Sequence, residues 1–134
     1  MKNYEILEHK ADLKIRASGK TREELFLNMM LGMEESMKPE TGKEKITRKI
    51  KIKSLDTPSL LVDFLSEVLY LIQINKEIYK DIKFQKLTDK EVEGELTALK
   101  AERFGEDIKA VTHHDLDIHQ NQNKTWEATV LFDI

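Results

Sequence analysis

Several stretches of the chain alternate apolar and polar residues, and each of them predicts a β-strand. In residues 13–18, Leu13, Ile15 and Ala17 fall on one face and polar side chains fall on the other, which is typical of a half-buried strand. Similar patterns predict further strands over residues 4–8, 45–53, 78–87, 91–102, 108–118 and 125–133. The last of these is the most regular, because its apolar set runs from Trp126 to Ile134 in steps of two.

Two other stretches repeat apolar residues every three or four positions, which predicts amphipathic helices. The first helix follows Thr21 and Glu24, which together match a capping box, and it ends before Pro39 and Gly42. The second opens at Thr57-Pro58, where the missing N–H of proline costs no hydrogen bond. The two apolar faces consist of Leu25, Phe26, Met29, Met30, Met33 and Met37, and of Leu60, Leu61, Phe64, Leu65, Val68, Leu69 and Ile72. The second face is the wider one, so we expect this helix to be central to the core.

The predicted order is strand, strand, helix, strand, helix and then four strands. This order favours an α+β fold in which two helices pack on largely antiparallel β-sheets. A chain of 134 residues suits one domain, and with only five glycines and two prolines it offers no evident linker or repeat. We therefore predict a single domain over residues 1–134.

Composition narrows the function classes. The chain has no cysteine, which excludes a disulfide framework, a cysteine nucleophile and a thiolate metal site. Charged residues make up 35% of the chain, but the net charge is only −3, whereas independent nucleic-acid binding usually needs a basic surface. No apolar run approaches the ~20 residues of a membrane span, and the first ten residues do not resemble a secretory signal. These features predict a cytoplasmic protein that does not bind membranes.

Carboxylates fall at two strand ends. The segment Glu8-His9-Lys10-Ala11-Asp12 joins the first two strands, where a rigid scaffold can orient functional side chains. A charged turn without a function would show the same residue types. At the other end of the chain, Asp133 precedes Ile134, whose α-carboxylate adds a second negative charge. Two close anions are unfavourable unless a cation lies between them. The alternative is an ordinary exposed strand end.

Two other clusters have simpler interpretations. On a regular strand, His113, Asp115, Asp117 and His119 would share one face. Neighbours on that face are about 6–7 Å apart, so too few of them converge for a tetrahedral zinc site, and we expect a solvated surface. Lys49, Lys51 and Lys53 would form a basic strand face, which either meets phosphates or is a solvated, guarded sheet edge.

No nucleophile–base motif, P-loop, dinucleotide-binding or zinc-protease signature is present. This absence lowers the expectation of catalysis.

Four segments in order along the chain resemble the archease family: LEHKAD (7–12), LLVDFLSEVLY (60–70), IKAVTHH (108–114) and WEATVLFDI (126–134). The first is similar to the family's EHTAD signature, the second to its LLVDWLNELLY helix, the third to its KAVTYH strand and the last to its closing strand. Lys10 stands where the family usually has threonine or serine, and His113 stands where it usually has tyrosine. Lys10 adds a positive charge near Asp12 that would weaken cation binding there.

The resemblance implies an accessory protein of the RtcB-type RNA ligase, which joins RNA ends in tRNA splicing and RNA repair. Archeases of this kind promote guanylylation and repeated turnover of the ligase, and some members are described as chaperones or modulators of a tRNA methyltransferase. The resemblance also implies a divalent cation, calcium or magnesium, with ligands at Asp12, Asp133 and Ile134 and support from His9. Carboxylate oxygens are hard donors that suit these ions better than zinc.

Two other functions remain open at the level of sequence. A metal-dependent hydrolase would use Asp12 and Asp133 to hold an ion that activates water, but His9 is its only evident base. A small RNA-binding module would use the lysines of 49–53 and would bind bare tRNA with a steep salt dependence. The acidic balance of the chain argues against the second function.

Overall fold

The computed structural model describes residues 3–8 and 12–134, and its elements follow the predicted order. In chain order they are β1 (Tyr4–Glu8), β2 (Asp12–Gly19), α1 (Arg22–Ser36), β3 (Pro39–Lys53), α2 (Thr57–Asn75), β4 (Glu77–Leu87), β5 (Glu91–Phe104), β6 (Ala110–Gln120) and β7 (Trp126–Asp133). All strand pairs are antiparallel. The predicted α+β class and the order of its elements are confirmed.

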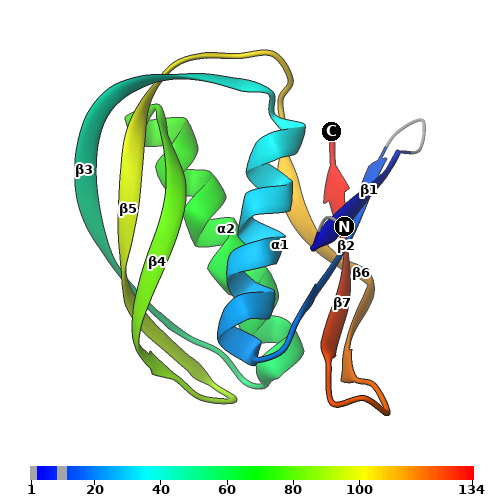
Figure 1. The fold of residues 1–134 in the computed structure, drawn as a ribbon. Coiled ribbons are helices and arrows are strands. Elements are labelled where there is room, and N and C mark those ends of the chain that lie inside the picture. Colours follow the sequence, from blue (N-terminus) through cyan, green and yellow to red (C-terminus); the bar gives the residue numbers. More distant parts are fainter. Residues whose placement is uncertain (1–2, 9–11) are drawn as a thin grey trace.

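The strands form two sheets with both helices between them (Figure 1). One sheet has the order β1-β2-β7-β6 and the other has the order β3-β5-β4. Helix α1 packs on β1, β2 and β7 and on β4 of the opposite sheet, whereas α2 packs mainly on β6 and β4. Each helix therefore contacts strands of both sheets.

The capping box of α1 forms as the sequence predicts, and α2 has an N-cap that the sequence analysis did not identify. Thr21 is the N-cap of α1 and its hydroxyl accepts a hydrogen bond from the backbone N–H of Glu24 at 3.1 Å. The Glu24 carboxylate accepts in return from the backbone N–H of Lys20 at 2.7 Å. The N-cap of α2 is Asp56, whose carboxylate accepts from the N–H of Ser59 at 2.8 Å. Both helices thus satisfy N-terminal donors that would otherwise lack partners.

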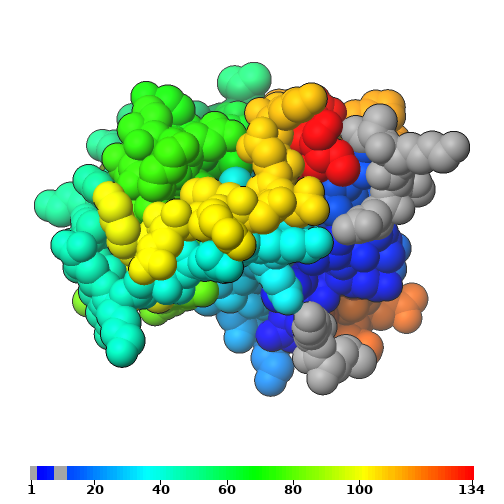
Figure 2. All heavy atoms as spheres, turned by 90° about the horizontal axis from the view of Figure 1, so that it is seen from above, coloured from blue at the N-terminus to red at the C-terminus, as the bar shows by residue number. Residues whose placement is uncertain are grey.

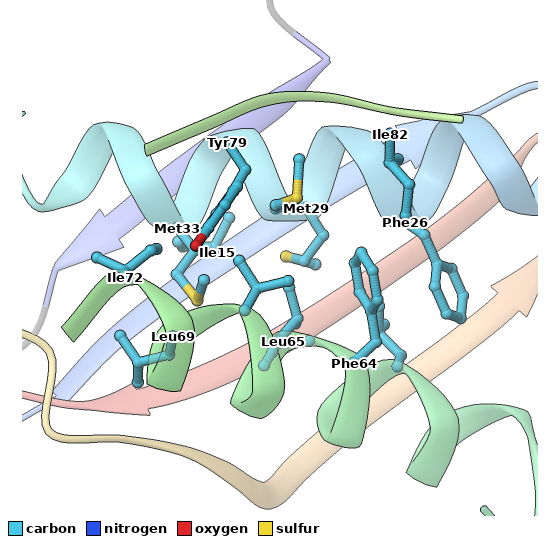
Figure 3. Close-up of a cluster of buried hydrophobic side chains, with 14 of the residues drawn as sticks. Ile15, Phe26, Met29, Met33, Phe64, Leu65, Leu69, Ile72, Tyr79 and Ile82 are labelled. Atoms are coloured by element: carbon cyan, nitrogen blue, oxygen red, sulfur yellow. The ribbon is translucent and has the colours of Figure 1, made fainter. Parts of the chain in front are cut away.

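The core lies where the two helices meet the sheets (Figure 3). Every apolar residue predicted for the two helix faces is buried, and Phe26 of α1 meets Phe64 of α2 with ring centroids 5.4 Å apart. Helix α2 is long and apolar enough to cross a membrane by length and composition. Eight of its side chains are buried between the sheets, so its apolar character is explained by its place in the core.

Strand β3 begins earlier than the pattern predicts. The structure starts it at Pro39 rather than at residue 45. Because β3 is an outer strand of its sheet, the missing N–H of proline is tolerated there. Register shifts between Glu40 and Lys45 absorb the residues around Gly42, which the alternation of apolar residues could not reveal.

A buried ion pair joins the outer strands of the smaller sheet. Glu77 of β4 is fully buried. Arg48 of β3 donates from Nε and Nη2 to its two carboxylate oxygens at 3.0 and 2.8 Å, and the Tyr79 hydroxyl donates to Oε1 at 3.0 Å. These hydrogen bonds, that of Arg48 above all, hold the pKa of Glu77 below its usual range. Glu77 is therefore a charged group whose burial is compensated by its partners.

A second buried carboxyl group ties α1 to β4. Glu34 of α1 is 3% exposed, and its Oε1 accepts a hydrogen bond of 2.6 Å from the backbone N–H of Tyr79. Burial raises the pKa of Glu34 well above its usual range, and neither the hydrogen bond from Tyr79 nor the charge of Lys80 cancels that effect. Protonation of Glu34 is therefore coupled to folding.

We expect Glu34→Gln to stabilise the protein increasingly as the pH rises. Because the pKa of Glu34 is higher in the folded state than in the unfolded state, the parent loses stability as the pH rises above the ordinary glutamate value of about 4.3. Glutamine keeps an acceptor for the Tyr79 N–H but carries no charge. Urea unfolding between pH 4 and pH 8 should show an advantage of the variant that is small at pH 4 and larger at pH 8. A pH-independent difference would contradict the coupling.

Candidate metal site

Asp12 and Asp133 lie directly opposite each other on neighbouring strands. The register of β2 on β7 pairs Asp12 with Asp133 and Leu13 with Phe132. Directly opposed residues point to the same face of a sheet, with Cβ atoms about 4.5–5.5 Å apart. Leu13 and Phe132 are buried, so both carboxylates lie on the face of the sheet that points away from the helices. The fold thus brings together two residues that are 121 positions apart in the sequence.

The surroundings of Asp12 are unusual for a carboxylate. Its Oδ1 atom is buried and has no hydrogen-bond partner among the described residues. A buried acceptor left without a partner costs about 1–3 kcal/mol, and the opposed charge of Asp133 adds repulsion. A cation placed between the two carboxylates would relieve both costs, so these two residues fit a metal ion.

Strand pairing on both sides holds the end of β7 in place. Asp133 pairs with Ala110 of β6 as well as with Asp12, and its carbonyl oxygen accepts a hydrogen bond from the backbone N–H of Lys109 at 2.8 Å. These main-chain contacts could not be predicted from residue types, because any residue at position 109 other than proline could donate the same bond. Figure 2 shows the chain end at the surface beside the segment that leads from β5 into β6.

Ile134 does not continue the inward-facing set as the alternation predicts. β7 ends at Asp133, and the side chain of Ile134 is 42% exposed. The paired part of β2 starts at Asp12 and that of β6 at Ala110. Among the described residues, Ile134 therefore has no strand partner that holds it in the core, and its main chain lies next to Asp133.

The donors at this end are all oxygens. Carboxylates suit calcium or magnesium, whereas zinc prefers histidine and cysteine. Within residues 3–8 and 12–134, no three His, Cys, Asp or Glu side chains are placed to hold one ion. Beyond Asp12 and Asp133, the described residues would therefore offer such an ion main-chain oxygens, and its remaining ligands would come from water, a partner or the part of the chain outside the described ranges. His9 and Lys10 of the predicted signature lie outside the described residues.

The histidine cluster of β6 is an exposed, irregular segment. The register of β6 on β7 shifts between Thr112 and Asp117, and Asp115 takes a φ of 53°, so the alternation expected over residues 113–119 is broken by a bulge. His119 contacts Asp117 at 2.7 Å and Glu127 at 3.6 Å. The expectation of a solvated surface agrees with this arrangement.

The lysines of β3 face glutamates of β5 along the ladder. Lys49 pairs with Glu95, and Lys53 pairs with Glu91; between them, Lys51 forms an ion pair with Glu93 at 3.3 Å. On the same face, Lys83 and Lys86 of β4 lie opposite Glu95 and Glu93. Five lysines therefore face three glutamates at these positions, so the glutamates neutralise most of the positive charge that RNA binding would use.

Comparison with known proteins gives consistent matches along the whole chain. The model of the Archease protein family matches residues 4–134. A curated protein archease of Methanosarcina barkeri is 38% identical, with 99% of this chain and 97% of that protein covered. The protein archease of Pyrococcus furiosus is 31% identical with both chains fully covered.

Two solved structures resemble the fold. The solution structure of protein 1598 from Methanobacterium thermoautotrophicum has a TM-score of 0.69 and 29% identity, with both chains fully covered. A crystal structure from Thermotoga maritima, described as an archease and possible chaperone, has a TM-score of 0.73 and 22% identity, with 96% of this chain and 94% of that chain covered. The second similarity concerns the fold alone.

We expect Asp12→Asn to remove calcium-dependent stabilisation without harming the fold. The substitution keeps the size of the side chain and removes one of two opposed charges, which relieves about 0.2–1 kcal/mol of repulsion in the metal-free protein. A ligand that binds only the folded state raises the melting temperature. Melting curves with and without calcium should therefore show an increase for the parent and none for the variant.

Asp81→Asn is a matched control, because Asp81 is an exposed aspartate in the other sheet. It should keep the response to calcium. An equal response of Asp12→Asn and the parent would remove Asp12 from the metal site.

Proposed function

Because this chain belongs to the archease family, we propose that it is a metal-binding accessory protein of an RtcB-type RNA ligase that acts in tRNA splicing and RNA repair. The observation that carries the proposal is the match of the family model over residues 4–134. The opposed pair Asp12 and Asp133 supports it, because these are the positions at which the resemblance implies metal ligands.

In this proposal Asp12, Asp133 and the main-chain carboxylate of Ile134 hold a calcium or magnesium ion. The ion would supply positive charge and open coordination positions to a ligand from the partner. The protein's own residues hold the carboxylates in position, because β2 and β6 fix Asp133 from both sides. The chain itself performs no covalent chemistry and acts by binding the competent state of the ligase more tightly than the incompetent state.

RNA enters this proposal only through a protein partner. The net charge of the chain is −3 and glutamates of β5 oppose the lysines of β3, so tRNA would be reached through the ligase or, as a second client, through a tRNA methyltransferase. The proposed place of action is the cytoplasm, without a membrane partner.

We expect the protein to raise the number of RNA joins made by each ligase molecule when GTP and a divalent metal are present. Ligation by an RtcB-type enzyme from the same organism, under single-turnover and multiple-turnover conditions, measures this effect directly. Equal rates with and without the protein would refute the proposed function. Hydrolysis of nucleotides or phosphate esters by the protein alone would favour the metal-dependent hydrolase instead.

Extension of the chain beyond Ile134 should weaken calcium binding and stimulation together. An added residue converts the Ile134 carboxylate into a neutral amide, and affinity for hard cations depends strongly on ligand charge. The increase in melting temperature on adding calcium should therefore shrink with a C-terminal extension. An N-terminal extension of equal length leaves all three proposed ligands chemically unchanged and is the control. If both forms respond equally, the Ile134 carboxylate is not a ligand.

A further inference from the structure

Two exposed apolar side chains lie one turn apart on α2. Among the described residues, the large hydrophobic side chains that are exposed are Leu55, Tyr70, Ile74 and Ile134. Tyr70 and Ile74 are each 54% exposed, although α2 otherwise supplies core residues. Single exposed apolar residues need no explanation, but neighbouring ones on a rigid element can form a binding surface.

Tyr70 and Ile74 belong to a longer row of residues on the helix. At 100° per residue, Asp63, Glu67, Tyr70 and Ile74 fall within an arc of about 60° and span about 16 Å along the axis. We call these four residues the α2 stripe. Asp63 and Glu67 form its acidic half, and Tyr70 and Ile74 form its apolar half. The opposite side of the helix carries the buried residues, so the stripe is the outward face.

The arrangement of the sheets leaves this face uncovered. Helix α2 contacts β6 of one sheet and β3, β4 and β5 of the other, and β6 and β3 are outer strands of their sheets. No further strand follows either of them in the sheets as described. The α2 stripe therefore faces the gap between two sheet edges, where a segment of another protein can approach.

The charge of the α2 stripe is negative. Asp63 and Glu67 are the only charged residues of α2, which contains no lysine or arginine. The Asp63 carboxylate accepts a hydrogen bond from the Ser54 hydroxyl, whereas Glu67 forms no ion pair within the described part of the chain. A segment complementary to the α2 stripe carries apolar side chains and, within about 15 Å of them, lysine or arginine.

We propose that the α2 stripe is a docking surface for an apolar and basic segment of the partner protein, which under the proposed function is the RNA ligase. A second copy of this chain fits less well. The acidic halves of two facing stripes would repel each other. RNA is a poor occupant for the same electrostatic reason.

Variants of the α2 stripe and of the metal site should separate binding of the ligase from its stimulation. Tyr70→Ala/Ile74→Ala should raise the Kd for the purified ligase about tenfold or more, because apolar anchors at the centre of an interface carry much of its affinity. Glu67→Lys should raise the Kd and weaken its dependence on salt.

Asp12→Asn should bind the ligase through the intact stripe but stimulate it poorly. Titration calorimetry measures affinity, and melting curves verify that each variant folds.

Glu44→Lys is the matched control for Glu67→Lys, since it makes the same charge change at an exposed position of β3 outside the α2 stripe. It should leave the Kd within about twofold of the parent. A parent that binds and stimulates the ligase, together with a double alanine variant that binds equally well, would overturn the docking surface and leave the proposed function standing. A parent that neither binds nor stimulates would overturn both. Sedimentation that shows a dimer lost in the double variant would assign the surface to a second copy.

Discussion

The contacts of Tyr79 join three parts of the molecule that would otherwise be separate layers. Its backbone N–H donates to Glu34 of α1, and its hydroxyl donates to Glu77, which in turn binds Arg48 of β3. Its ring is buried in the core (Figure 3). Since a buried carboxyl group without partners is strongly unfavourable, these bonds restrict how α1 and the smaller sheet can be arranged.

The pair Asp12 and Asp133 is unfavourable for the isolated chain, and its position explains how the fold tolerates it. Leu13 and Phe132, which directly adjoin the pair, are buried partners in the same ladder. The apolar contacts of the ladder fix the register, because a shift by one residue would turn Leu13 and Phe132 out of the core. The two carboxylates are therefore held opposite each other by their neighbours rather than by their own interaction. Strained arrangements of this kind are common where a site is prepared for a ligand.

The sequence predicted the fold far better than it predicted the polar interior. Apolar periodicity identified all nine elements, because burial of Leu25, Phe64 or Val130 depends on spacing alone. It could not identify Glu34 and Glu77 as buried, since their partners come from strands and helices that are distant in the chain. The bulge in β6 was missed for a related reason: a single φ of 53° at Asp115 leaves no trace in the alternation of residue types.

The candidate site was only partly predictable. The carboxylates at positions 12 and 133 could be read from the sequence, but their direct opposition follows from the antiparallel pairing of β2 with β7. Apolar spacing leaves Tyr70 and Ile74 outside the buried face of α2. It could not show that no described strand covers them, because that depends on the position of the sheet edges.

In the proposed complex, the two surfaces are connected by two hydrogen bonds to the segment between β5 and β6. Gln73, next to Ile74 on α2, donates from Nε2 to the carbonyl oxygen of Ile108 at 3.0 Å. One residue further along the chain, the N–H of Lys109 binds the carbonyl oxygen of Asp133. A partner seated on the α2 stripe would therefore meet the proposed metal site at a fixed offset, because these hydrogen bonds tie the segment between β5 and β6 to α2 on one side and to β7 on the other. Such an offset lets one surface supply affinity while the other discriminates between states of the ligase, which is what an accessory protein requires if it is to be released after each turnover.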